Sequence, residues 1–210
     1  MASHLYPTAR GRGSYMKSTD LIRWGGLAAM LAGVAWATSG IVHFVLVYPG
    51  EGAGPLGSTA MYLIESAHAV AEAGMLGALL GLNARQAPAY GRLGRAGFAL
   101  AFLGTALLCA ITVIAVITHD ALGEAFLTTV FVSGLFGWLV GFPLLGVATL
   151  RARVLPRWCG MLLLAFVPLV VFLLSSYGWG GIALGLLWLA LGYALIFLER
   201  SIGARPVNAT

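Results

Sequence analysis

Six long apolar runs, separated by short segments that hold most of the charges, constrain this chain more than any other feature of its sequence. A helix rises about 1.5 Å per residue, so all but the marginal fifth run are comfortably long enough to cross a hydrocarbon core of roughly 30 Å. The runs are continuous and lack period-two alternation, which predicts helices rather than strands. Their approximate bounds are Leu21–Tyr48, Thr59–Leu82, Ala96–Thr118, Ala125–Leu150, Trp158–Leu174 and Gly180–Leu198.

The composition supports a membrane protein and excludes two other classes. Hydrophobic residues make up 60% of the 210 residues and charged residues only 9%, whereas a typical soluble domain has roughly 25% charged residues. Disorder throughout is also excluded, because it requires low hydrophobicity and high charge. The sequence therefore predicts an all-α polytopic bundle of six transmembrane helices over residues 21–199. Residues 1–20 are expected to form a disordered cytoplasmic tail, and residues 200–210 a second cytoplasmic tail.

The basic residues predict the orientation of the chain in the membrane. The connections after the first, third and fifth runs contain no basic residue, and they carry Glu51, Asp120 and Glu124 instead. The positive-inside rule then places both termini in the cytoplasm, where the arginines would contact anionic lipid. Nucleic acid is not an expected partner, since the basic residues occur in short clusters between apolar runs. The 12 basic residues are Arg10, Arg12, Lys17 and Arg23; Arg85, Arg92 and Arg95; Arg151, Arg153 and Arg157; and Arg200 and Arg205.

Similar sequences at the ends of the runs suggest three helical hairpins in series. The first, third and fifth runs open with RWGG, RLGR and RWCG, and the other three close with LNAR, ATLR and FLER. Convergence is the alternative, because every cytoplasmic helix end favours arginine and an interfacial aromatic residue.

Near the start of the chain, Met16 is an alternative first residue. The Ala35-Trp36-Ala37 pattern resembles a signal-peptidase site, but the apolar run continues beyond it and is interpreted as an uncleaved span.

Three segments resemble a widespread group of uncharacterised small six-span membrane proteins of high-GC bacteria. They are RWGGLAAMLAGVAW, LLGLNARQAPAYGRLGRAGFALAFLGTALL and GVATLRARVLPRWCGMLLL. The similarity covers most of the first five runs and depends mainly on the two arginine-bearing loops, YGRLG and LPRW. The resemblance implies a multi-pass protein of the bacterial cytoplasmic membrane, and it implies no reaction and no functional residues.

The second run contains the residues most indicative of function, because ionisable groups inside a membrane are costly. Glu65, His68 and Glu72 are spaced i, i+3 and i+7, which places them within an arc of about 60° on one helix face. His43 lies near the outer end of the first run, and His119 and Asp120 follow the third. The sequence thus predicts a polar pocket in the outer half of the first three spans, formed by His43, Glu65, His68, Glu72, His119 and Asp120.

This pocket is open to several interpretations. The leading one is the binding or passage of a small ligand or ion. The second is a redox subunit that holds a metal ion or a b-type haem, with His43, Glu65 and His68 as candidate ligands; Glu65 and His68 form a Glu-x-x-His sequence.

Two further interpretations involve no chemistry. One is a non-catalytic accessory subunit, whose outer polar cluster would bind a lipid headgroup, a quinone or a partner chain; a homo-oligomer is a further alternative. The other treats the His–Glu group as a buried, hydrogen-bonded pair that ties the first two spans together. An enzyme is disfavoured: Ser133 lies in a Ser-Gly pair within the fourth run, but no histidine follows it to act as a base.

Overall fold

The chain folds into six long helices. The computed structural model describes residues 12–47, 55–118 and 124–203, and these described residues include no β-strand. All six helices are long and apolar enough to cross a membrane, which confirms the predicted all-α transmembrane bundle. The helices are α1 (Arg12–Val42, continued by the π-helical turn η1, His43–Val47), α2 (Pro55–Gln86), α3 (Gly91–Thr118), α4 (Glu124–Ala152), α5 (Arg157–Ser175) and α6 (Tyr177–Gly203).

The first and last helices are longer than the apolar runs that predict them. α1 begins at Arg12, so residues 12–20 of the expected N-terminal tail are helical, and α6 continues to Gly203. Apolar composition indicates only the part of a helix that lies in hydrocarbon, whereas the backbone hydrogen bonds of a helix can continue beyond it. The remaining tail residues, 1–11 and 204–210, lie outside the described residues.

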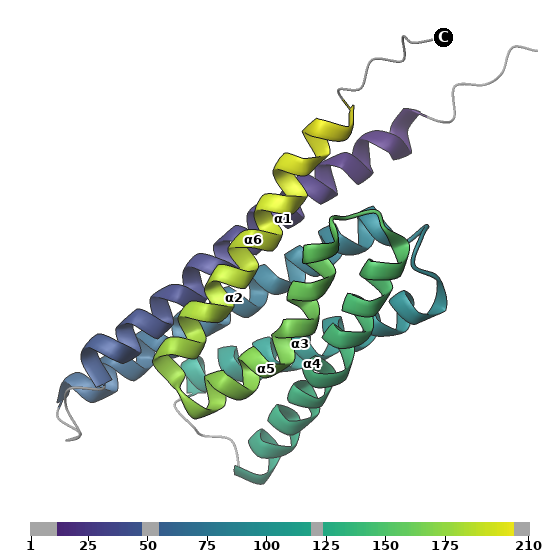
Figure 1. Ribbon diagram of the computed structural model, residues 1–210. Coiled ribbons are helices and arrows are strands. Elements are labelled where there is room, and N and C mark those ends of the chain that lie inside the picture. Colours follow the sequence, from purple (N-terminus) through teal and green to yellow (C-terminus); the bar gives the residue numbers. More distant parts are fainter. Residues whose placement is uncertain (1–11, 48–54, 119–123, 204–210) are drawn as a thin grey trace, which may run out of the picture.

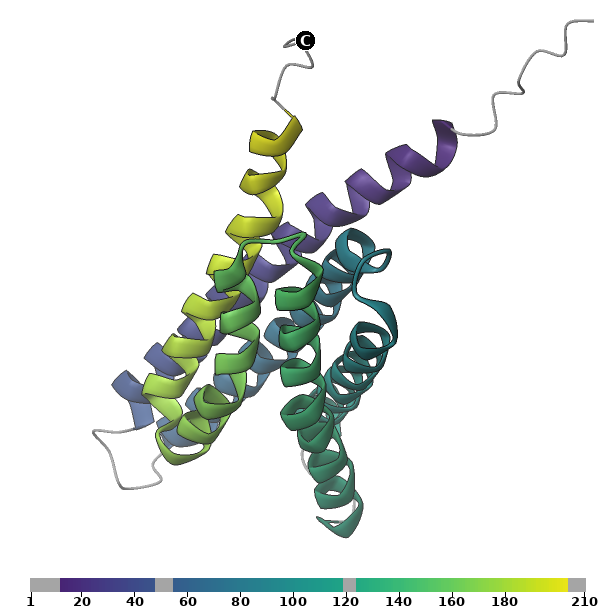
Figure 2. The same cartoon turned by 45° about the vertical axis from the view of Figure 1, so that its right-hand side comes forward.

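The contacts between successive helices make a closed ring, and Figure 1 shows α6 lying along α1. Each packs against its neighbours in sequence, and α6 completes the ring by packing along α1. The most extensive contacts are those of α1 with α6 and α2, and of α3 with α4, and Figure 2 shows α1 and α6 running side by side before their ends diverge. Two of the three expected hairpins, α1/α2 and α3/α4, are therefore closely packed, while the main partner of α6 is α1 rather than α5.

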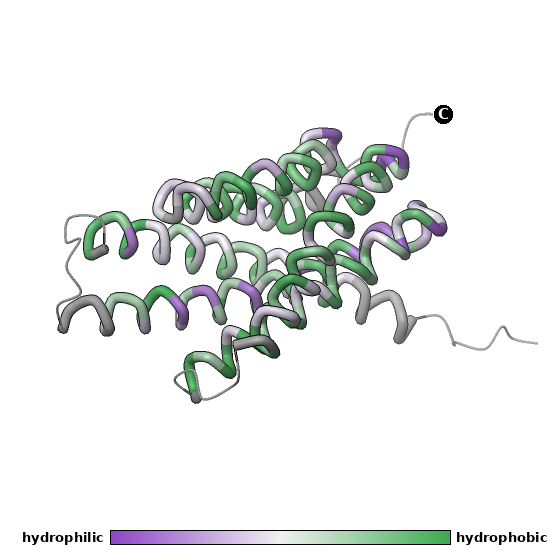
Figure 3. Tube along the Cα trace, turned by 90° about the horizontal axis from the view of Figure 1, so that it is seen from below, coloured by the Kyte–Doolittle hydropathy of each residue, from purple (hydrophilic) through white to green (hydrophobic). Residues whose placement is uncertain are grey.

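One end of the bundle carries the arginines. The described ends of α1 and α6 lie there together with the α2–α3 and α4–α5 connections, as Figure 1 shows. These connections and the adjoining helix ends hold the arginines of the two central clusters, at positions 85–95 and 151–157. In Figure 3 the helices are mostly green or pale; purple segments lie at this end, and a further series of them lies along one helix in the other half of the bundle. We call it the arginine end and the other the opposite end.

Glycines allow the closest helix pairs to approach backbone to backbone. A Cβ atom added at Gly25 of α1 would lie 2.5 Å from the Cα of Gly81 of α2, and one added at Gly104 of α3 would lie 2.9 Å from the Cα of Gly137 of α4. Without a side chain at these positions, the backbones can make the close van der Waals contacts that hold membrane helices together. The abundant glycine of this sequence is thus used for helix packing.

The centre of the ring is filled mainly by aromatic side chains. Phe142 of α4 and Phe166 of α5 pack with ring centroids 3.9 Å apart, and Trp138 lies 5.3 Å from Phe166. Trp188 of α6 and Trp36 of α1 complete the group from the other side. All five are buried. Large apolar residues also cover the outer surface, among them Ile117, Leu103 and Phe136, which suits contact with lipid.

Candidate functional site

Two adjoining cavities lie between α2, α3 and α4. The larger, of about 350 Å³, is near the opposite end of the bundle and is lined by Glu65 and His68 together with residues of α3 and α4. The smaller, of about 210 Å³, lies deeper and is lined by His68, Glu72 and mostly apolar side chains, some of which come from α1 and α5. The two cavities share His68, Thr112 and Phe131 in their walls, so they adjoin, and we refer to them together as the pocket.

Among the described residues, those of α2 supply all the ionisable groups that line this pocket. Glu65 is half-buried beside the larger cavity, His68 borders both cavities, and Glu72 borders the smaller one. The i, i+3, i+7 spacing therefore does place the three side chains along one face of α2, as the sequence predicts. They form a line that leads from the opposite end of the bundle toward its centre.

Glu72 is the most deeply placed of the three. Only 5% of its surface is exposed, and Thr112 of α3 forms a hydrogen bond with its carboxyl group. The second carboxyl oxygen, Oε2, is buried and has no hydrogen-bond partner among the described residues. An unpartnered polar atom beside a cavity marks a place where a ligand can make a strong contact, because leaving the atom unpaired is costly.

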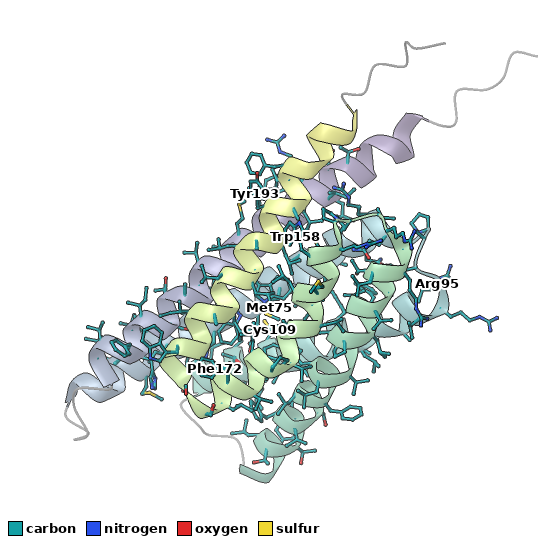
Figure 4. The ribbon with its side chains drawn as sticks, in the orientation of Figure 1. Met75, Arg95, Cys109, Trp158, Phe172 and Tyr193 are labelled. Atoms are coloured by element: carbon teal, nitrogen blue, oxygen red, sulfur yellow. The ribbon has the colours of Figure 1, made fainter. Side chains whose placement is uncertain are left out.

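Aromatic rings from α1 and α4 form the walls around this carboxyl group. Trp36 packs against His68 with ring centroids 4.7 Å apart, and both rings line the smaller cavity. Trp138 and Phe131 of α4 line it from the other side. The indole N–H of Trp138 donates to Thr105 Oγ1 at 2.9 Å, and that of Trp36 points to Met75 Sδ at 3.3 Å. Met75 is labelled in the interior of the bundle in Figure 4. These contacts hold both indoles in place beside the cavity.

The remaining predicted site residues are placed differently. His43 begins the π-helical turn η1 and is not among the described residues that line either cavity. It does lie close enough to His68 for their charges to interact. His119 and Asp120 fall outside the described residues. The described pocket thus belongs mainly to the second, third and fourth spans, rather than to the first three.

The predicted metal ligands do not form a complete set. Within the described ranges, no group of three or more His, Cys, Asp or Glu side chains is placed to hold a metal ion. His43, Glu65 and His68 therefore do not make up a three-residue site. Ser133, the candidate intramembrane nucleophile, is exposed, and its hydroxyl donates to the Thr129 carbonyl of its own helix at 2.8 Å. This is an ordinary hydrogen bond for a serine in a membrane helix.

Sequence reasoning missed the aromatic walls of the pocket. Trp36, Phe131 and Trp138 lie within apolar runs, where aromatic residues are expected as core or lipid-facing side chains. No local pattern distinguishes an aromatic residue beside a cavity from one in a filled core, because the difference depends on which helix lies opposite.

The comparisons with known proteins assign no function to this pocket. No family model, no curated protein and no solved structure matches the chain.

Proposed function

We propose that the protein binds a small cation in this pocket, with Glu72 as the principal contact. The observation that carries the proposal is the unpaired Oε2 of a carboxyl group that is 5% exposed and borders a cavity of about 210 Å³. An isolated carboxylate is expensive to bury in apolar surroundings. Its free oxygen therefore requires either a proton or a cationic ligand.

The surroundings of Glu72 favour a cation that carries apolar groups. Trp36, Phe131 and Trp138 present aromatic rings to the cavity, and the negative faces of such rings attract cations. Most of the other lining residues are aliphatic and suit alkyl substituents. Glu65 beside the larger cavity adds a second acidic group along the way in. A small alkylammonium ion meets all of these conditions.

The structure supports binding more than passage through the bundle. Beyond Glu72 the centre of the ring is occupied by the packed rings of Phe142, Phe166 and Trp188. A cation that moved further along the axis would have to displace them. If the arginine end faces the cytoplasm, as the positive-inside rule indicates, the pocket lies in the outer half of a bacterial cytoplasmic membrane and receives its ligand from outside.

Calorimetric titration of the purified protein tests this proposal. Tetramethylammonium and benzyltrimethylammonium serve as cationic probes, and benzyl alcohol serves as an uncharged aromatic control. We expect both cations to bind and benzyl alcohol not to bind. Glu72→Gln keeps the size of the side chain but removes its charge, and it should weaken cation binding by at least about tenfold, as expected for the loss of a buried charge-assisted contact.

Two other acid-to-amide variants serve as comparisons. Glu65→Gln should weaken binding less than Glu72→Gln, because Glu65 is only half-buried. Asp20→Asn changes an exposed acid on α1 outside the pocket and should leave binding unchanged. Equal binding of benzyl alcohol and the cations, or full affinity in Glu72→Gln, would contradict the proposal and leave the accessory-subunit interpretation in its place.

A further inference from the structure

A second group of polar side chains, two of them buried and one half-buried, lies at the arginine end of the bundle, away from the cation pocket. It consists of Arg85 and Gln86 in the last turn of α2, together with Thr149 of α4. Gln86 is fully buried, with 0% of its surface exposed, and Thr149 is also buried, whereas Arg85 is half-buried and only part of its guanidinium is enclosed. Glutamine and arginine are seldom buried without partners, so this group needs an explanation that helix packing alone does not provide.

The hydrogen bonds of this group are incomplete. The Thr149 hydroxyl lies 2.9 Å from Gln86 Oε1 and 2.8 Å from the Leu145 carbonyl oxygen. Gln86 Nε2 is buried and has no partner among the described residues, and the same is true of Arg85 Nη1. Because the single hydroxyl proton of Thr149 can serve only one acceptor at a time, part of the Gln86 amide is unpaired whichever way the amide is turned.

With the Gln86 amide as it is placed in the structure, the two unpaired atoms, Gln86 Nε2 and Arg85 Nη1, are both donors, and the second is charged. The guanidinium of Arg85 lies close enough to Cys159 of α5 for its charge to act on the thiol, so it is near the α4–α5 part of the bundle. Arg92 and Arg151 add positive charge at the same end. A buried guanidinium nitrogen without an acceptor is unfavourable, whereas an oxyanion would satisfy it and would be attracted by the surrounding positive potential.

We propose that Arg85 and Gln86, supported by Thr149, bind one phosphate-type oxyanion at the arginine end. The planar fork of a guanidinium matches the oxygens of a phosphate group, and the amide N–H of glutamine supplies a further donor. A lipid headgroup and a soluble phosphate both present this chemistry. The site shares no residue with the cation pocket, so the two proposals stand independently.

The test measures the thermal unfolding of delipidated, detergent-purified protein with inorganic phosphate or with phosphatidylglycerol. We expect at least one of these anions to raise the unfolding temperature of the unmodified protein. A response to phosphate identifies a soluble anion as sufficient. A response to phosphatidylglycerol alone identifies a lipid headgroup, and native mass spectrometry should then detect the bound lipid.

A matched pair of arginine variants separates a defined site from general surface charge. Arg85→Gln should weaken the anion response by at least about tenfold, as the loss of a buried charge-assisted contact implies. Arg95→Gln makes the same change of charge at an exposed arginine at the outer edge of the molecule (Figure 4), and it should retain the response. An equal loss in both variants would overturn the proposal, because it would show a diffuse electrostatic effect.

A third variant keeps the proposal testable if Arg85→Gln does not fold. Gln86→Glu is nearly isosteric and places a carboxylate beside Arg85, where it would replace the bound anion. We expect this variant to unfold at the same temperature as the unmodified protein or higher, and to have lost its anion response. Failure of both anions to stabilise the unmodified protein would overturn the proposal and indicate that water satisfies these donors.

Discussion

The imidazole of His68 on α2 packs against the indole of Trp36 on α1, with ring centroids 4.7 Å apart and ring planes inclined by 39°. Trp36 is 3% exposed, so this contact lies inside the bundle. It connects the ionisable face of α2 to the central aromatic group, because Trp36 also packs against Trp138 at 6.3 Å. The pocket and the core of the protein are therefore in direct contact.

This ring pair predicts how substitutions of His68 affect stability. His68→Phe keeps an aromatic ring against Trp36 and should lower the free energy of unfolding by less than about 1 kcal/mol. His68→Ala removes the ring and enlarges the cavity, so it should cost about 2 kcal/mol or more. Reversible unfolding in mixed micelles, followed by tryptophan fluorescence, measures both values. Equal stability of the two variants would show that the ring contact contributes little.

The close approach of α1 and α2 predicts a strong effect of one methyl group. Gly25→Ala would place a Cβ atom 2.5 Å from the Cα of Gly81, where only backbone movement can relieve the clash. We expect a loss of about 1–3 kcal/mol, as for other overpacked contacts. Gly178→Ala is the matched control, because its nearest neighbour would lie at 3.4 Å, an ordinary contact. A comparison of thermal unfolding in detergent checks both variants, and equal tolerance of the two would contradict this packing.

We expect Tyr90, in the α2–α3 connection outside the spans, to make a pH-dependent contribution to the stability of the protein. Burial raises the pKa of its hydroxyl above the ordinary value of 10.0, against the opposing effect of Arg95. The folded protein thus holds this proton to higher pH than the unfolded chain does. The contribution is present below about pH 10 and decreases as the pH rises through the raised pKa. Absorbance of the tyrosinate ion at rising pH follows the ionisation of the hydroxyl. Unfolding measurements at the same pH values follow the loss of stability.

Substitution of Tyr90 by phenylalanine tests the same contact. The Tyr90 hydroxyl donates a hydrogen bond to Asn83 Oδ1, so Tyr90→Phe should lower stability at neutral pH by about 1 kcal/mol. It should also reduce the loss of stability above pH 10. Tyr193→Phe removes a hydroxyl from an exposed tyrosine of α6 (Figure 4) and should change neither quantity. An unchanged pH profile in Tyr90→Phe would assign the alkaline loss to other groups.

The arginine distribution predicts which end of the bundle is cytoplasmic. In a variant without Cys109 and Cys159, a cysteine at Ala89 in the α2–α3 connection should be protected from a membrane-impermeant thiol reagent in intact cells. A cysteine at Ser175, the exposed last residue of α5 at the opposite end, should react. Both should react once the membrane is opened. The reverse pattern in intact cells would invert the orientation and place the cation pocket on the cytoplasmic side.

Much of the architecture was predictable because it depends on local composition. Apolar runs of membrane length must form helices, since no water is present in the bilayer to satisfy the backbone. The number, order and approximate position of the six helices follow from this rule. The shared face of Glu65, His68 and Glu72 follows from helical periodicity. Helix ends were less predictable, as α1 shows, because helical hydrogen bonding continues beyond the apolar run.

The composition of the pocket depended on contacts between helices that are distant in sequence. In the sequence, nothing marks Trp36, Thr112 and Trp138, which lie in three different apolar runs. Only the packing of α1, α3 and α4 with α2 brings them to the cavity beside Glu72. In the sequence, Arg85 is one of the arginines that predict topology, and nothing distinguishes the neighbouring Gln86; the contact of Gln86 with Thr149 depends on the tertiary structure. Helix formation is governed by the solvent that each segment meets, and the sequence alone determines it. Pairing of helix faces is governed by short-range contacts such as Gly25 against Gly81, and only the tertiary structure decides it.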